Sequence, residues 1–179
     1  MLKKTLIKQV LILLFIINMS SCEKDRNIDQ QTKTEIIKNV DIFLNDWHKA
    51  ASEADFENYF TKMDSISVFI GTDASENWTK KEFMLFSKPY FDEGKAWDFK
   101  TLERNIYTNN SLNFIWFDEL LDTWMGVCRG SGIIEIKNSK PSIKQYVLSF
   151  TVPNDNADKI IQIKRKKDSM MIHKLRPDF

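Results

Sequence analysis

The spacing of apolar residues predicts helices in the first part of the chain. Between Ile36 and Ala51 apolar side chains recur every three or four residues, which is the period of one helix face. Thr32 and Glu35 have the spacing of a capping box and are expected to begin this helix. A shorter helix is expected from Asp55. Both helices have one apolar face, so both are expected to pack against another layer.

The clearest helix start in the chain is at Thr79. Thr79 and Glu82 form a second capping box, and Trp78 and Phe83 are placed to form a hydrophobic staple around it. Proline removes an amide donor and clashes with the preceding turn, so we expect this helix to end or kink at Pro89.

Alternation of apolar and polar residues with a period of two predicts that most of the remaining chain is extended. Strands are expected over residues 65–70, 96–107, 111–117, 124–137 and 143–152. A change of parity predicts a bulge near Lys100 or Thr101. A last helix is expected after Pro153. Helices followed by a run of antiparallel strands predict an α+β domain with the helices on one face of the sheet.

Three glycines fall within the predicted strand 124–137. Gly126, Gly130 and Gly132 would weaken a regular strand, so we expect a sharp bend there or a close approach by another group. A sheet that curls and is closed by helices leaves a cavity. The sequence therefore predicts a curved sheet around a hollow.

The first 22 residues have the pattern of an export signal. Basic residues precede an apolar run that is too short for a permanent span, which needs about 20 residues. Small residues then lead to Cys22, and the segment resembles a bacterial lipoprotein signal. This resemblance implies a signal peptide over residues 1–21, an acylated Cys22 with a polar tether over residues 22–33, and a domain over residues 34–179. An ordinary secretory signal or a buried N-terminal helix is the alternative.

A lipoprotein signal implies a location in the bacterial cell envelope. Membrane lipid would be a partner through the acylated Cys22, and two or more acyl chains hold a protein stably on a membrane. We favour the outer over the inner membrane, with the domain facing the periplasm or the cell surface.

Composition narrows the range of partners. Without residues 1–21, 23 of the 26 basic residues remain against 25 acidic ones, a formal charge of −2. This balance argues against nucleic acid as a partner.

The two histidines, His48 and His173, are far apart in the sequence, so we expect no metal site and no cofactor. Cys128 is expected to serve packing, and His48 to be a half-exposed structural residue.

Three segments carry a family resemblance: residues 114–119, residues 125–132 and residues 145–150, which are followed by Pro153. Over residues 34–165 the chain resembles bacterial nuclear transport factor two-like proteins, which share the ketosteroid isomerase and SnoaL-like fold. The resemblance implies a conical, curved antiparallel sheet, or cystatin-like roll, with helices packed over it. It also implies a homodimer through the outer face of the sheet.

The isomerase chemistry of that family implies a carboxylate base and two acidic hydrogen-bond donors. Asp73 is the nearest match for the base. The first helix has no tyrosine for one donor, and Ser131 or Gly132 stands where the other donor would be. We therefore expect the domain to bind a small, largely apolar ligand or a protein partner rather than to catalyse isomerisation. An enzyme that uses Asp73 or Asp118 as general base is the alternative, and a purely structural domain is a third hypothesis.

Two groups of side chains have competing interpretations. The first group comprises three acidic residues with an arginine across a hairpin: Asp118, Glu119, Asp122 and Arg129. Its carboxylates either lie at the mouth of a cavity or form salt bridges at the end of the hairpin. Aromatic residues either line a pocket or fill the core, and they are Trp47, Tyr59, Trp97, Trp116 and Tyr146. The ligand contacts that we expect are Trp47, Tyr59, Trp116, Asp118, Arg129 and Tyr146.

Basic residues gather late in the last predicted helix, at residues 164–167. They are expected to be solvated and to complement the helix dipole. A contact with anionic headgroups is the alternative.

Overall fold

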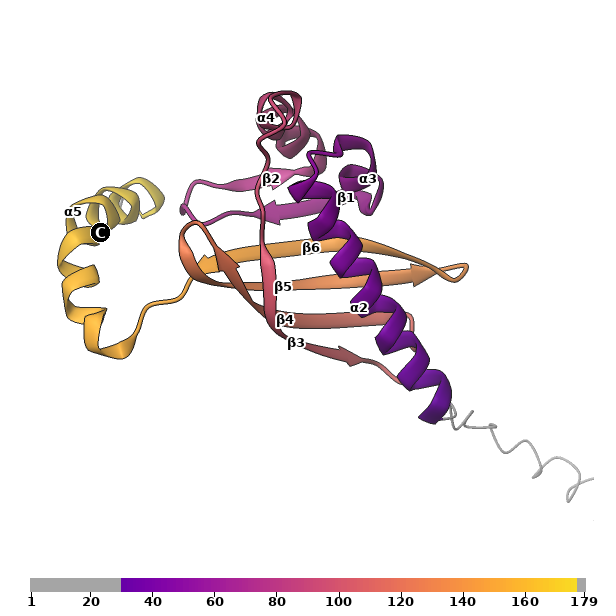
Figure 1. Cartoon of the computed structure of the whole chain (residues 1–179). Helices are drawn as coiled ribbons and strands as arrows, with labels where there is room; N and C mark the ends of the chain where they lie inside the picture. The colour runs from indigo at the N-terminus through magenta and orange to yellow at the C-terminus, as the bar shows by residue number, and fades with distance from the viewer. Residues whose placement is uncertain (1–29, 177–179) are drawn as a thin grey trace, which may run out of the picture. The chain divides into compact units, whose positions relative to one another are not determined.

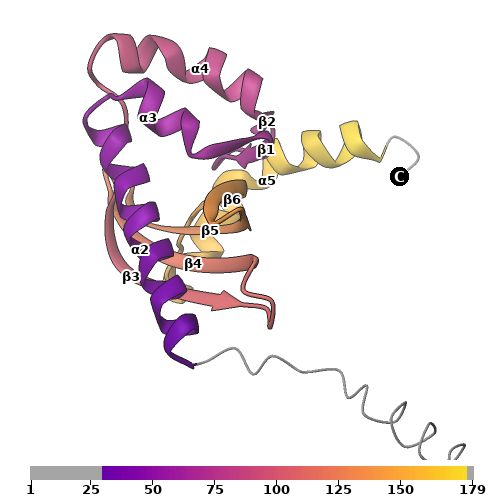
Figure 2. The ribbon, with the colours of Figure 1, turned by 90° about the vertical axis from the view of Figure 1, so that its right-hand side faces the viewer.

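A six-stranded sheet carries helices α2, α3 and α4 on one face in the computed structural model, which describes residues 30–176 (Figures 1 and 2). Cys22 and the predicted signal peptide lie outside the described residues. The elements are α2 Gln30–Ser52, α3 Phe56–Thr61, β1 Met63–Ile70, β2 Asn77–Thr79, α4 Lys80–Asp92, β3 Lys100–Thr108, β4 Phe114–Thr123, β5 Gly126–Lys137, β6 Lys140–Phe150, a 3₁₀ turn Asn154–Asn156 and α5 Ala157–Leu175.

The strands are arranged in the order β2-β1-β6-β5-β4-β3. Four of the five pairings are antiparallel, and β1 runs parallel to β6. The predicted α+β class with helices over a curved sheet is confirmed, but the expectation of a wholly antiparallel sheet is wrong for this one pair. No hairpin constrains it, since β1 and β6 are far apart in the sequence.

The helix starts predicted from capping residues are confirmed for α3 and α4. The Asp55 side chain accepts the Asn58 amide at 3.1 Å and begins α3. The Thr79 capping box is present at the start of α4, and the rings of Trp78 and Phe83 stack with centroids 5.6 Å apart. The capping box expected at Thr32 is wrong, because α2 already includes Gln30 and Thr32 lies inside it.

The helix α4 continues through Pro89 to Asp92, so the prediction that it ends at Pro89 is wrong. Proline in a helix removes the bond to the carbonyl four residues earlier, here that of Leu85. Leu85 and Pro89 are both exposed, so water can satisfy that carbonyl.

The strand β4 is longer than predicted. It runs to Thr123 instead of ending at Phe117, and residues 118–123 are strand rather than a connection. Residues at odd positions face inward and those at even positions face outward, so Asp118 and Glu119 lie on opposite faces. The expected cluster of Asp118, Glu119 and Asp122 is therefore not formed.

Two glycines of β5 allow close approach, as predicted. A Cβ atom at Gly130 would lie 2.2 Å from the Tyr146 hydroxyl oxygen, and one at Gly132 would lie 2.6 Å from the Gln145 carbonyl oxygen. The predicted bulge in β3 is also confirmed, as a register shift between Thr101 and Glu103. The strand begins only at Lys100, so residues 93–99 connect α4 to β3 without regular structure.

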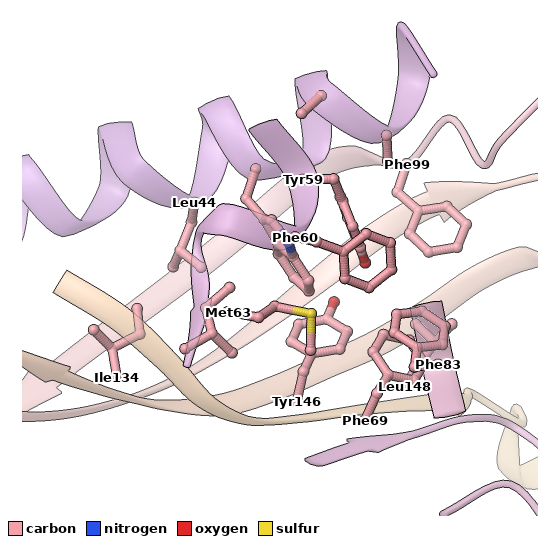
Figure 3. Close-up of a cluster of buried hydrophobic side chains, with 14 of the residues drawn as sticks. Leu44, Tyr59, Phe60, Met63, Phe69, Phe83, Phe99, Ile134, Tyr146 and Leu148 are labelled. Atoms are coloured by element: carbon pink, nitrogen blue, oxygen red, sulfur yellow. The ribbon is translucent and has the colours of Figure 1, made fainter. Parts of the chain in front are cut away.

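Aromatic side chains fill the space between the helices and the sheet (Figure 3). Tyr59 reaches into it from the helical layer and Tyr146 from the sheet. The Trp47 and Tyr59 rings stack at 4.9 Å, and those of Phe69 and Phe83 at 3.9 Å. The part of the hollow beneath α2 and α3 is thus packed core.

Two further expectations concern Cys128 and the apolar composition of the helices. Cys128 is completely buried, which confirms its packing role. Between Gln30 and Arg176 no helix has the length and apolar composition needed to cross a membrane.

Candidate functional site

One carboxylate, Glu119, is buried on the inner face of the sheet beneath α2. Its Oε1 atom accepts hydrogen bonds from His48 Nε2 and from the Tyr146 hydroxyl, both at 2.8 Å. Its Oε2 atom accepts one from Arg104 Nε, also at 2.8 Å. An ionised carboxylate only accepts, so the hydrogen of the His48 ring lies on Nε2.

Arg104 extends this cluster to the surface of α2. Its Nη1 atom donates to Asp41 Oδ1 at 2.6 Å and to Asn45 Oδ1 at 2.8 Å, and its Nη2 atom donates to Thr101 at 2.8 Å. The cluster of Asp41, His48, Arg104, Glu119 and Tyr146 therefore joins α2 to strands β3, β4 and β6; we call it the Glu119 cluster.

His48 is 5% exposed, so the prediction of a half-exposed histidine is wrong. The buried carboxylate of Glu119 accepts a hydrogen bond from the His48 ring, and this bond makes a buried position favourable for the histidine.

The protonation states of the cluster follow from its contacts. Burial on its own raises the pKa of Glu119, but the hydrogen bond and charge of His48, the charge of Arg104 and the Tyr146 hydroxyl together lower it. Burial and the nearby Glu119 charge raise the pKa of Tyr146 well above its ordinary value. Tyr146 thus stays protonated and donates to an ionised Glu119.

This arrangement leaves little for Glu119 to do in catalysis. Its side chain is fully buried and both oxygens already accept hydrogen bonds. A general base needs to reach the proton that it removes. The Glu119 cluster is therefore a structural ion-pair network.

A pocket of about 730 Å³ lies beyond this cluster, next to α4 and the irregular segment before β3. Its walls are largely aromatic, and the aromatic lining residues are Phe69, Trp78, Phe83, Phe86, Tyr90, Trp97, Phe99 and Trp124. We call it the aromatic pocket. Tyr59 contacts Trp97 with ring centroids 5.5 Å apart, so the packed core adjoins one wall.

Several rings of the aromatic pocket are nearly parallel. Trp78 stacks on Phe86 at 4.6 Å and 23° and on Phe83 at 5.6 Å and 15°. Trp124, in the turn between β4 and β5, is 83% exposed. Exposed tryptophan beside stacked rings offers a large apolar surface to a ligand.

Charged residues form the rim of the aromatic pocket. Lys100 approaches Asp98 at 3.8 Å, and Lys95 and Asp122 are exposed. The half-buried Glu76 accepts the Asp73 amide at 3.0 Å. The two lysines and the two aspartates are exposed to water, so the pocket combines an apolar wall with a polar edge.

The six predicted ligand contacts do not form one site. Trp47, Tyr59 and Tyr146 are buried together in the core, each 1% exposed. Trp116, Asp118 and Arg129 lie on the opposite, outer face of the sheet. None of the six lines the aromatic pocket, whereas Trp97, also considered as a lining residue, does. Their ligand roles stay predictions.

Asp118 and Arg129 form an ion pair at 3.3 Å on the outer face, which agrees with the salt-bridge interpretation of these residues. Strand β4 continues past them, so the pair lies within the sheet and not at its end.

Asp73 lacks the raised pKa of a general base. Its carboxylate is exposed and accepts hydrogen bonds from the Ser75 hydroxyl at 2.6 Å and the Ser75 amide at 2.9 Å. These bonds lower the pKa of Asp73. Neither Asp73 nor Asp118 lines the aromatic pocket.

Sequence reasoning missed Arg104 and the inward position of Glu119. One signal was available: Ile115, Phe117, Glu119 and Leu121 alternate, which places a carboxylate on the apolar side of a strand. A charged residue at such a position requires a partner.

Among residues 30–176 no group of three metal-ligating side chains is close enough to hold an ion.

The sequence profile of one protein family, described as SnoaL-like domain, matches residues 40–153. No curated protein matches the chain.

Solved structures with the same fold have very different sequences. An NTF2-like protein of unknown function from Pseudomonas putida is 8% identical, with 66% of this chain and 89% of that chain covered and a TM-score of 0.55. A domain with a cystatin-like fold from Nostoc punctiforme is 10% identical, with 81% and 99% covered and a TM-score of 0.58. A candidate dehydratase of the NTF2-like family from Streptomyces avermitilis is 7% identical, with 68% and 99% covered and a TM-score of 0.57. At these identities the likeness establishes the fold alone.

Replacing Glu119 by glutamine is expected to lower the free energy of unfolding by about 3–5 kcal/mol, because Arg104 then loses its buried partner. Urea titration at neutral pH measures the effect. Asp118→Asn, one residue away on the exposed face, is the matched control and should change stability by less than about 1 kcal/mol.

The same variant has a second expected effect, on acid stability. The folded-state pKa of Glu119 is below its ordinary value of 4.5, so its stabilisation is complete above that pH and is lost as pH falls through the folded pKa. Glu119→Gln should therefore lose less stability on acidification than the wild type. Equal acid dependence of the two proteins would contradict this account of the cluster.

Proposed function

Since the chain belongs to the SnoaL-like domain family, we propose that its domain binds a small, largely apolar molecule in the aromatic pocket. The fold does not decide between an enzyme and a binding module, so the proposal depends on the chemistry of the site. It commits to ligand binding without catalysis.

The observation that carries this proposal is the aromatic pocket itself. Its volume of about 730 Å³ lies within the range of small-molecule sites, about 300–1,000 Å³. Aromatic rings supply most of its apolar wall, and the charged groups stay at its rim. Such a site gains free energy by removing an apolar ligand from water.

The chemistry of the carboxylates favours binding over catalysis. A base of raised pKa requires a carboxylate in an apolar, enclosed place. Asp98 and Asp122 are exposed, and Glu76 accepts a backbone amide. The enclosed carboxylate, Glu119, has a lowered pKa and lies outside the pocket lining.

Trp124→Ala is expected to weaken binding of the apolar dye N-phenyl-1-naphthylamine about three- to tenfold, because one ring contact is lost. Dye fluorescence, titrated against the purified protein, gives the dissociation constant. Trp116→Ala is the matched control, since Trp116 is a tryptophan on the outer face and should leave the constant unchanged.

The opposite result would reject the proposal. Weaker binding in Trp116→Ala with no change in Trp124→Ala would place the ligand on the outer face and support the original prediction for Trp116. Absence of dye binding by the wild type would also reject a ligand-binding pocket. Far-ultraviolet circular dichroism of both variants checks that the fold is retained.

We further propose that the protein is an envelope lipoprotein held by acylated Cys22, with the outer membrane favoured. The supporting observation is the sequence before the domain: a basic start, a short apolar run and small residues ahead of the cysteine.

Cys22→Ala is expected to release the protein from the membrane fraction, since the acceptor of the acyl chains is gone. Centrifugation of host membranes at high salt, followed by immunodetection, measures the release. A variant that still sediments with the membranes would exclude the lipid anchor.

A homodimer through the outer face of the sheet is a further proposal. Tyr107, Phe114 and Trp116 are each more than 40% exposed on β3 and β4, and an exposed apolar patch of this kind is typical of an interface. Sedimentation velocity of the wild type should give twice the monomer mass, and Trp116→Lys should shift it toward the monomer. A monomeric wild type at micromolar concentration would contradict the proposal.

A further inference from the structure

A second pocket adjoins the aromatic pocket at Thr72. Its volume is about 540 Å³, and its lining includes Phe150, Val152 and, from α5, Ile160 and Lys164. Thr72 lines both pockets. Both pockets therefore reach the loop that follows β1.

The strand β6 gives independent evidence that the two pockets are neighbours. Leu148 pairs with Gly130, and Phe150 pairs with Cys128, so both side chains lie on the inner face of the sheet. Leu148 lines the aromatic pocket and Phe150 lines the second pocket. They are two residues apart, about 7 Å along the strand. The two pockets are therefore neighbours along this face near the end of β6, and together we call them the groove.

The far end of this groove differs chemically from its beginning. The apolar wall continues there with Phe150, Val152 and Ile160. Among the residues that line the second pocket, Lys164 is the one with an ionisable side chain. Helix α5 is basic, with six lysine or arginine residues against two aspartates. The second pocket is therefore lined by a lysine and by no acidic residue, whereas the aromatic pocket is lined by two lysines and three acidic residues.

One face of α5 is turned toward this end of the groove. Ile160, Lys164, Lys167 and Met171 follow one another at helical spacing, and Ile160 and Met171 are half-buried. Lys167 is close enough to Asp73 for its charge to act on that carboxylate. Asp73, in the loop that follows β1, therefore already has a cation of α5 near it.

We propose that the ligand is an amphiphile with a single anionic end. Its apolar body lies in the aromatic pocket, and its carboxylate, phosphate or sulfate group pairs with Lys164 at the far end of the groove. This inference rests on the proposed function and adds the class of ligand to it.

The present partner of Lys164 can be displaced by such a ligand. Lys164 lies 3.6 Å from Asp168, and both side chains are about half exposed or more. Exposed pairs of this kind contribute little. A ligand anion that brings its own apolar body into the groove gains from burial as well as from charge.

The test compares two probes of equal length, dodecanoate and 1-dodecanol, as competitors of N-phenyl-1-naphthylamine on the purified protein. We expect dodecanoate to displace the dye at about fivefold lower concentration than dodecanol, the scale of one partly exposed charge pair. Lys164→Gln should abolish this preference and leave dodecanol unchanged. Lys166→Gln is the matched control, because Lys166 lies on the same helix but outside the groove, and it should keep the preference.

The outcomes separate this inference from the proposal on which it rests. Equal displacement by both probes in the wild type, or a preference that survives in Lys164→Gln, would overturn the anionic end. Dye binding that neither probe can displace would overturn the amphiphile and leave the aromatic pocket as a binding site. Absence of dye binding rejects the proposed function itself.

Discussion

The burial of the Glu119 carboxylate is the constraint to which most of the structure conforms. A charge buried on the inner face of a sheet is tolerated only when hydrogen bonds and opposite charge replace water. His48 supplies one such bond from α2, Arg104 supplies another from β3, and Tyr146 supplies a third from β6. The His48 bond, together with the Arg104 bonds to Asp41 and Asn45, ties α2 to the sheet. The Tyr146 contact also requires glycine at position 130, where any side chain would collide with the Tyr146 hydroxyl.

The position of the aromatic pocket follows from this constraint. The space under α2 and α3 is filled by the Glu119 cluster and by the rings of Trp47 and Tyr59. Free volume remains where α4, the irregular segment before β3 and the β4–β5 turn meet, away from the cluster. The free volume therefore lies at the margin of the curved sheet rather than under α2 and α3, and polar groups there can face water.

Local signals predicted the fold well, and tertiary contacts account for the errors. The capping box at Thr79, the cap at Asp55 and the close approach at Gly130 each depend on a few neighbouring residues. The end of β4 was misjudged because Glu119 interrupts the apolar alternation, and its partners come from distant segments. The aromatic pocket was not predicted as a unit, since its residues belong to separate elements whose proximity no sequence spacing encodes. The ligand contacts predicted from residue type alone fall on both faces of the sheet for the same reason.

The parallel pairing of β1 with β6 has a consequence for biogenesis. About seventy residues separate the two strands, so β1 and β2 emerge from the ribosome long before their neighbour exists. Contacts between distant segments are slow to form, and unpaired strand edges promote association with other chains. The order of synthesis therefore leaves one strand edge of the nascent domain open until nearly the whole polypeptide has been made.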